Sequence, residues 1–268
     1  MMLFTGWLRQ PGRGRRILRG LLALTVCALM GFALYVYVSY TYLWDPKQEL
    51  CMSDAWDALC AHGGDVGPLV RDRVAPTGEA FLSWRRICAD GDSGPRLGDP
   101  DEPWNALSNR VAARGGALTF CFSPPPWFIE KLFPSCGRSQ TKVLAIAGPD
   151  TAFDPCRTTS LQNLPPNLIL LVEVWGTGIN WLQPGDIDVR DYRHLRMDGR
   201  DGRGCWVLFA DGILAFIKSD VPLENVKRFC TITSAKKSVR LALLGPYIEK
   251  VDDLVRDPPR NEVEALIP

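Results

Sequence analysis

Histidine is scarce in this sequence: its 268 residues include only two, His62 and His194, which lie 132 positions apart. No Cys-x2-Cys pair is present either, so the ligand spacing of a structural zinc site is missing. The sequence also lacks a phosphate-binding loop, a dinucleotide fingerprint and the Gly-x-Ser-x-Gly elbow of many hydrolases. These absences predict a protein without a metal, without a cofactor and without enzymatic activity.

Positive charge is not concentrated in the way that nucleic-acid binding requires. The 31 basic and 30 acidic residues give a formal net charge of +1, and no run of lysine or arginine is interleaved with aromatic residues. The pair Lys236 and Lys237 is typical of a solvated turn. We therefore expect no nucleic-acid partner.

One long segment lacks charge altogether. Residues 20–44 run for 25 positions without a formal charge and follow a cluster of arginines between positions 13 and 19. As a helix they would reach roughly 37 Å, more than the ~30 Å hydrocarbon core of a bilayer. We predict a transmembrane helix at 20–44, with residues 1–19 as a basic cytoplasmic segment and the remainder extracytoplasmic, in a protein of the cell membrane.

Two alternatives remain open for this segment. A cleaved secretory signal also begins with a basic region, but its apolar part is usually about 7–15 residues long, and no small-x-small cleavage site precedes Asp45. A buried helix of a globular domain would leave no polar face for solvent.

Eight of the nine cysteines follow residue 44, where an oxidising compartment would permit disulfides. Their even number fits pairing, but the sequence names no connectivity. Buried thiols are the alternative, and a metal site is the least favoured because the spacing is unsuitable. The eight candidates are Cys51, Cys60, Cys88, Cys121, Cys136, Cys156, Cys205 and Cys230.

A second helix is expected directly after the apolar segment. It begins at Asp45, a suitable N-cap, with Pro46 at the first helical position, and it ends at Gly63 and Gly64. Its apolar side comprises Met52, Ala55 and Leu59. Residues 63–115 are rich in Gly, Pro and Asp, so we predict mostly loop there.

Short apolar runs beyond this loop predict β-strands, because they are β-branched or aromatic and are bounded by Pro and Gly. The five runs are 117–122, 142–147, 168–174, 205–210 and 213–217. A helix is expected over 223–229, a further strand over 239–245 and a further helix over 247–256.

Asp211 and Gly212 separate the last two of these runs. Asp-Gly supplies the positive φ angles of a type I′ turn, so 205–217 is predicted to be a hairpin. We interpret Asp211 as a turn residue rather than a catalytic acid, because no motif supplies a partner for it.

Other carboxylates gather in two loops. Asp99, Asp101 and Glu102 form one group, and Asp186 and Asp188 form the other. Both groups lie among Pro and Gly residues, so we expect solvated turn residues, with calcium binding as the alternative.

Glu173 interrupts the apolar run at 168–174. We expect it to face outward from a strand that is buried on one side. The alternative is a buried acid that needs a partner such as Arg85.

Six segments occur in an order that resembles a known family. They are FLSWR (81–85), DEPWNALSNR (101–110), AIAGPDTAF (145–153), LILLVEV (168–174), NWLQPGDIDV (180–189) and WVLFADGILAFI (206–217). Together they resemble the planctomycete-type domain of unknown function 1559, a family of pseudopilin-like proteins. The resemblance covers residues 77–230. It implies an α+β fold in which a transmembrane helix precedes an extracytoplasmic antiparallel sheet packed on helix, and it implies no known enzymatic activity.

The sequence departs from this family at two places. The family's C-terminal His-x9-Asp-Gly signature has Asp201 here where the His would stand, and the apolar run after Gly20 lacks the Glu that pseudopilins carry. Neither a role for that His nor assembly into a pseudopilus is therefore expected.

These observations predict a helical stem and linker at 45–76, a pseudopilin-like domain at 77–230 and a C-terminal extension at 231–268. The predicted function is that of a membrane-anchored envelope protein, bound to the membrane through its apolar segment, with a structural or interaction role toward an unidentified envelope protein. The alternative is an anchored hydrolase or ligand-binding protein that uses loop carboxylates. Such a protein would bring acids together in one cavity, and the candidates are Glu173, Asp186, Asp188 and Asp211.

Overall fold

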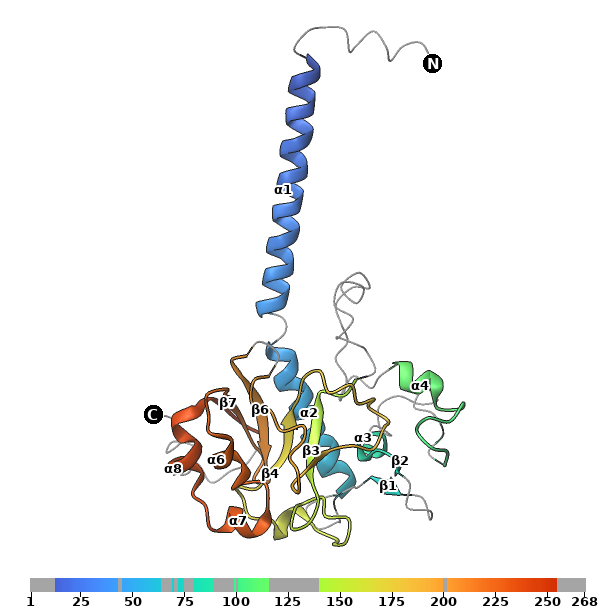
Figure 1. Ribbon diagram of the computed structural model, residues 1–268, viewed down its shortest axis with the longest axis vertical. Helices are drawn as coiled ribbons and strands as arrows, with labels where there is room; N and C mark the ends of the chain where they lie inside the picture. The colour runs from blue at the N-terminus through green and yellow to red at the C-terminus, as the bar shows by residue number, and fades with distance from the viewer. Residues whose placement is uncertain are drawn as a thin grey trace. The chain divides into compact units, whose positions relative to one another are not determined.

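Four apolar runs of the C-terminal half belong to a six-stranded mixed sheet (Figure 1). The computed structural model describes residues 13–42, 45–63, 69, 72–74, 80–88, 99, 101–115, 140–199 and 202–254. The chain divides after Gln48 into two units, and the sheet belongs to the second.

The strands are short, and their order in the sheet differs from their order in the chain. They are β3 (Val143–Ala147), β4 (Ile169–Glu173), β5 (Ile187–Asp188), β6 (Gly204–Phe209), β7 (Ile213–Lys218) and β8 (Ile248–Asp253). Across the sheet the order is β5-β3-β4-β6-β7-β8. All neighbours are antiparallel except β3 and β5, which are parallel. The predicted antiparallel sheet is therefore corrected to a mixed one, because the connection after β4 returns the chain to the far side of β3.

Helices cover both faces of this sheet. After α1 (Arg13–Tyr42) come α2 (Asp45–Gly63), α3 (Trp84–Cys88), α4 (Arg110–Gly115), α6 (Leu223–Lys227), α7 (Ile232–Lys236) and α8 (Arg240–Leu244), with short 3-10 helices η5 (Leu161–Asn163) and η6 (Gly245–Tyr247). Successive strand residues point to opposite faces. Val143 thus joins one core cluster together with Leu59 of α2, whereas Leu144 joins the other together with Val226 of α6 and Leu244 of α8.

The helix predicted from Asp45 is confirmed as α2. Met52, Ala55 and Leu59 are at most 1% exposed. Their spacing of three and four residues places them on one face of a helix, which packs into the first core cluster.

The predicted transmembrane helix at 20–44 is wrong. The helix begins at Arg13, inside the arginine cluster, rather than at Gly20. Within the described ranges, no helix combines the length and the apolar character needed to cross a bilayer.

At the C-terminal end the predicted strand and the predicted helix are exchanged. The strand predicted over 239–245 is instead the helix α8, and the helix predicted over 247–256 contains the strand β8. β8 pairs antiparallel with β7, and Ile248 and Val251 pack against the second core cluster. Pairing with a neighbouring strand therefore outweighs the local helical pattern.

The stretch predicted as loop, 63–115, contains short elements. β1 (Arg73–Val74) and β2 (Ala80–Leu82) form a separate two-stranded antiparallel sheet, and α3 and α4 follow. The strand predicted at 117–122 lies outside the described residues.

The hairpin at 205–217 is confirmed, but its turn type is different. β6 and β7 pair from Gly204↔Lys218 to Leu208↔Leu214. Gly212 has a φ of 81°, Asp211 has no positive φ, and the amide of Gly212 donates to the carbonyl of Phe209 at 3.0 Å. A type I′ turn needs positive φ at both central residues, so this loop is a type I turn followed by a left-handed glycine.

Candidate functional site

Trp84 begins α3 where two other segments meet it. The amide of Ser83 donates to the carbonyl of Leu182 at 3.0 Å, and the amide of Trp104 donates to the carbonyl of Phe81 at 2.9 Å. A helix as short as α3 has little stability of its own. Contacts with segments distant in the sequence therefore fix the position of Trp84.

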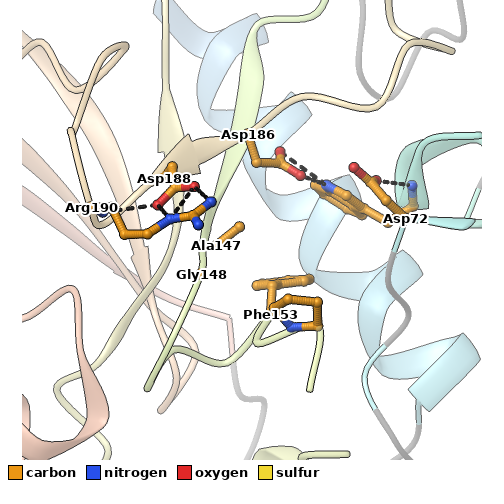
Figure 2. Close-up of a pocket in the computed structure, with 9 residues that line it drawn as sticks. Asp72, Ala147, Gly148, Phe153, Asp186, Asp188 and Arg190 are labelled. Atoms are coloured by element: carbon orange, nitrogen blue, oxygen red, sulfur yellow. Dashed lines mark hydrogen bonds and ion pairs between the residues drawn. The ribbon is translucent and has the colours of Figure 1, made fainter. Parts of the chain in front are cut away.

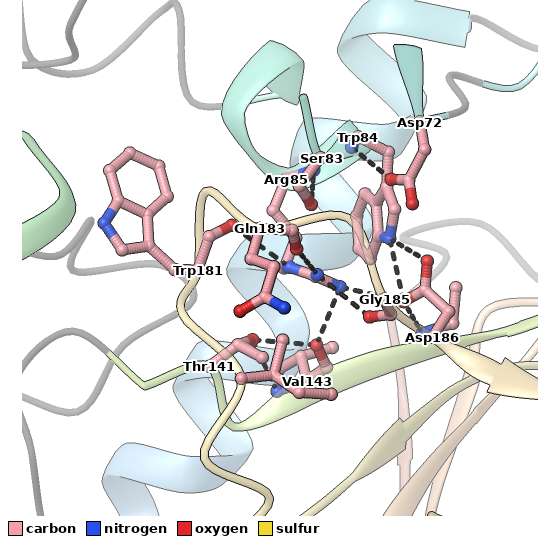
Figure 3. A network of polar contacts seen from close by, with 12 residues as sticks. Asp72, Ser83, Trp84, Arg85, Thr141, Val143, Trp181, Gln183, Gly185 and Asp186 are labelled. Atoms are coloured by element: carbon pink, nitrogen blue, oxygen red, sulfur yellow. Dashed lines mark hydrogen bonds and ion pairs between the residues drawn. The ribbon is translucent and has the colours of Figure 1, made fainter. Parts of the chain in front are cut away.

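The next residue, Arg85, is completely buried and is surrounded by acceptors (Figure 3). Its Nε donates to the Trp181 carbonyl at 3.3 Å, and Nη2 donates to the carbonyls of Gln183 and Gly185 at 3.0 and 3.1 Å. Its Nη1 forms an ion pair with Oδ1 of Asp186 at 2.8 Å. Arg85 thus holds the loop before β5 in one conformation.

Asp186 accepts from three residues of two different segments. Besides Arg85, the amide of Ala145 in β3 donates to Oδ1 at 2.9 Å, and the indole Nε1 of Trp84 donates to both carboxylate oxygens at 3.1 and 3.2 Å. Only 6% of its side chain is exposed. The prediction that Asp186 is a solvated turn residue is therefore wrong, because these donors replace water around the carboxylate.

Asp72 lies on the other side of Trp84. Its Oδ1 accepts from the backbone amide of Trp84 at 2.7 Å. Burial, followed by the nearby negative charge of Asp186, raises the pKa of Asp72 to about 7, although Arg85 and hydrogen bonds from the amides of Trp84 and Gly185 oppose the shift. Trp84 therefore holds two carboxyl groups from segments 114 positions apart (186 minus 72), one through its backbone and one through its ring.

These two acids line a pocket of about 520 Å³ (Figure 2). Among the described residues of its lining, the polar ones are Asp72, Asp186, Asp188 and Arg190, and the apolar ones are Trp84, Ala147, Phe153 and Pro155. The rings of Trp84 and Phe153 have centroids 5.6 Å apart and are tilted by 39°. The pocket thus combines an aromatic wall with carboxylates, which is the usual make-up of a small-molecule site.

A second ion pair lies at the mouth of the pocket. The Nε of Arg190 donates to both oxygens of Asp188, at 2.9 and 3.0 Å, and Nη2 also contacts Oδ2. The side chains are 74% and 32% exposed, respectively. Hydrogen bonds from Arg190 hold the pKa of Asp188 below its usual value.

Gly148 lets the chain pass close to this mouth. Its φ is 111°, and a Cβ at this position would lie 3.0 Å from Cγ2 of Val189 and 3.1 Å from Oδ1 of Asp188. Any other residue would therefore be strained and crowded there. The glycine sets the distance between the wall of the pocket and the ion pair.

The arrangement is suited to binding a small organic molecule. Asp186 is occupied by its donors and Asp188 by Arg190, which leaves Asp72 as the carboxyl group with the least opposing charge. In the described part of the chain, no group of three or more His, Cys, Asp or Glu side chains could hold a metal ion. This finding gives no support to the calcium alternative.

Of the four acids expected in one cavity, the structure brings two together. Asp186 and Asp188 line the pocket. Glu173 lies in β4, and Asp211 lies in the hairpin turn, where its Oδ1 accepts from the amide of Ile213 at 3.2 Å and its carboxylate pairs with Arg240.

Glu173 does not face solvent. It is 4% exposed, and its Oε2 accepts from the backbone amide of Trp206 at 3.1 Å. The prediction of an outward-facing residue is wrong because β4 is a central strand with both faces covered. Arg85, the partner considered for it, pairs with Asp186 instead.

The first acidic loop follows the prediction. Asp99, Asp101 and Glu102 are exposed, and the amide of Asp101 donates to Oδ1 of Asp99 at 2.9 Å, as in a turn.

Two charged lining residues, like the aromatic ones, were not predicted from the sequence. Asp72 lies in a stretch predicted to be loop, and nothing in its surroundings marks it. Arg190 follows Asp188 by two positions, and that spacing was the one available indication.

No two of the described cysteines lie within disulfide distance. Cys205 and Cys230 are buried thiols, and burial raises the pKa of Cys230 to about 12. Cys121 and Cys136 lie outside the described residues, so pairing that involves them stays a prediction.

No family model matches the chain, no curated protein matches it, and no solved structure matches it. The resemblance to the pseudopilin-like family stays a prediction.

Proposed function

We propose that the unit that carries the sheet is a ligand-binding domain and that the pocket beside Trp84 is its site. One observation carries this proposal: Trp84 holds Asp72 and Asp186 at the same pocket whose aromatic wall it forms. A purely structural role would explain the buried ion pair of Arg85 and Asp186. It would not explain the open pocket of about 520 Å³ next to that pair.

Binding fits this geometry better than catalysis. Acid–base hydrolysis needs two groups that exchange protons with the substrate. Asp186 accepts from Arg85, Trp84 and Ala145, so its oxygens are already occupied. Burial raises the pKa of Asp72 to about 7, whereas hydrogen bonds from Arg190 hold the pKa of Asp188 below its usual value. One such group suits recognition of a ligand rather than a two-group reaction.

A second candidate is a pseudopilin-like structural component of the cell envelope with an unidentified protein partner. It is favoured by the way in which the segments that resemble that family meet in the fold. Residues 81–85 contact 180–189 through Ser83 and Arg85, and the carbonyl of Ala112, just beyond 101–110, accepts from the indole of Trp181 at 3.1 Å. In this candidate the polar network is purely architectural.

The two candidates are separated by thermal melts of the full chain with a panel of small molecules at millimolar concentration. The panel contains benzylamine, benzyl alcohol, benzoate, glucose and glycine. Ligand binding to the native state alone raises Tm, so the proposal predicts a rise with at least one compound. The variant Ala147→Leu, which adds bulk inside the pocket, should lose that rise.

Ala113→Leu is the matched control, because Ala113 is a partly buried alanine of α4 that does not line the pocket. It should keep the response of the unmodified chain. If no compound raises Tm, the ligand-binding proposal is overturned and the structural candidate is favoured.

A further inference from the structure

Among the described residues of the pocket, negative charge is in excess. Three carboxyl groups belong to this set, at Asp72, Asp186 and Asp188. Two guanidinium groups balance them, Arg85 against Asp186 and Arg190 against Asp188. If all five groups are ionised, one negative charge has no cation of its own among the described residues.

That excess charge is located at Asp72. Among the described residues, Arg85 is the one cation that acts on its pKa, and Arg85 already donates to Asp186 and to the carbonyls of Gln183 and Gly185. The hydrogen bond from the Trp84 amide at 2.7 Å supplies a dipole rather than a full charge. A partly buried carboxylate whose nearest cation is shared with another acid is costly, so this position favours either a proton or a bound cation.

The wall next to Asp72 is aromatic. Trp84 and Phe153 present rings with centroids 5.6 Å apart, and Pro155 continues the apolar surface. A cation gains from lying over an aromatic face, and an apolar body gains from contact with it. The volume of about 520 Å³ holds a molecule of the size of a substituted benzene ring.

Other ligand classes fit this lining less well. Anions meet the excess of carboxylates, and a neutral sugar leaves the charge at Asp72 uncompensated. A divalent metal would need several oxygen ligands, and no group that could hold one is found within the described residues.

We propose that the ligand is a small organic monocation, a primary amine with an aromatic or aliphatic body. Its ammonium group lies beside Asp72, and its body packs against Trp84 and Phe153. This inference rests on the proposed function, because it names the class of molecule that the pocket binds.

Binding of such a cation displaces the proton of Asp72. Burial and Asp186 raise the pKa of Asp72 to about 7, so near neutral pH the free pocket is partly protonated. The charged groups around it are Asp186, Arg85, Asp188 and Arg190, and each of the two acids forms an ion pair with one of the arginines. The ammonium ion should therefore bind more tightly as pH rises through about 7.

The test is calorimetric titration of the full chain with benzylamine, which is protonated throughout the range used. The affinity should be about tenfold higher at about pH 8 than at about pH 6, because the fraction of ionised Asp72 changes by that factor. Titrations in two buffers of different ionisation enthalpy should show release of protons at the lower pH. Benzyl alcohol, the neutral analogue, and benzoate, the anion, should bind far more weakly, and calcium chloride should give no binding heat.

Asp72→Asn keeps the shape and the acceptor for the Trp84 amide but removes the charge. This variant should lose the pH dependence and the proton release, whereas Asp220→Asn, an exposed aspartate outside the pocket, should behave like the unmodified chain. If Asp72→Asn does not fold, Ala147→Leu supplies the test, because it should abolish benzylamine binding.

Absence of benzylamine binding, or binding that does not depend on pH, overturns the inference. Equal binding of benzyl alcohol or benzoate that is blocked by Ala147→Leu would overturn the cationic class and leave the ligand-binding function standing. Absence of binding by every compound in the panel would overturn both.

Discussion

Two Arg–Asp ion pairs flank the pocket, and they differ in almost every physical respect. Arg85 and Asp186 are 0% and 6% exposed, whereas Arg190 and Asp188 are 74% and 32% exposed. The inner pair links α3, β3 and the loop before β5. The outer pair joins two residues that are neighbours in the sequence.

This difference shows that the same pair of residue types serves two purposes. The inner arginine donates to buried carbonyls and supplies the cation of a buried carboxylate, so it determines the shape of the pocket. The outer pair is screened by water and gains little from its own contact. We therefore expect the inner pair to stabilise the fold around the pocket. The outer pair is expected to contact the bound ligand.

The largest expected effect follows from breaking the inner pair. Arg85→Met leaves Asp186 buried without its cation and several carbonyls without donors, so the free energy of unfolding should fall by about 3–5 kcal/mol. Urea denaturation of the full chain, followed by tryptophan fluorescence, measures it. Arg190→Met, the matched change in the outer pair, should leave the urea midpoint nearly unchanged. Equal losses for both variants would contradict the comparison.

The second effect concerns pH and Asp72. Its pKa of about 7 in the folded state exceeds the ordinary value of 3.8, so the native state holds an extra proton between these values. Stability should therefore fall as pH rises from about 4 to about 7, by at most about 1.4 kcal/mol per pH unit, and level off above. The difference between the unmodified chain and Asp72→Asn isolates this contribution in urea melts at a series of pH values. If the difference in the free energy of unfolding between the two chains stays constant from about pH 4 to about pH 7, this contribution of Asp72 is refuted.

A third ion pair has intermediate burial and should have an intermediate effect. Arg240 and Asp211 are 12% and 18% exposed. Asp211→Asn keeps an acceptor for the amide of Ile213 but loses the charge opposite Arg240, so we expect a loss of about 1–2 kcal/mol, between the values for exposed and buried pairs. Thermal melts measure it. A loss of stability as large as that of Arg85→Met would contradict the relation between the burial of an ion pair and its contribution to stability.

The smallest effect is expected at the mouth of the pocket. Asp188→Asn should leave Tm unchanged, because its partner Arg190 is largely exposed and water replaces the contact. The same variant should weaken benzylamine binding, since it removes one carboxylate from the pocket. A clear loss of Tm together with unchanged binding would assign Asp188 to the fold instead.

The sequence predicts those parts of the fold that depend on local pattern. The runs that form β3, β4, β6 and β7 are short, apolar and bounded by Pro or Gly, and the apolar residues of α2 repeat at helical spacing. Each of these properties is contained in fewer than twenty consecutive residues, so a single pass along the chain finds them.

Features that depend on distant partners were not predictable in this way. β8 is a strand because it pairs with the free edge of β7, although its own sequence, IEKVDD, favours no strand. Glu173 is buried because strands flank it on both sides.

The site itself follows the same rule. Asp186 and Asp188 were found as an acidic pair, but the burial of Asp186 depends on Arg85, 101 positions away. Asp72 joins them through the backbone of Trp84. No local pattern contains such contacts, because they arise only when the chain folds.

The pKa of the Asp72 carboxyl group tests the central claim most directly. Carbon-detected NMR of the full chain, with Asp72→Asn used to assign the signal, follows this group through a pH titration. The account predicts a midpoint of about 7 that moves to lower pH when benzylamine is added. A midpoint near the ordinary value of 3.8, unchanged by benzylamine, would show that no excess negative charge resides there and would contradict the account.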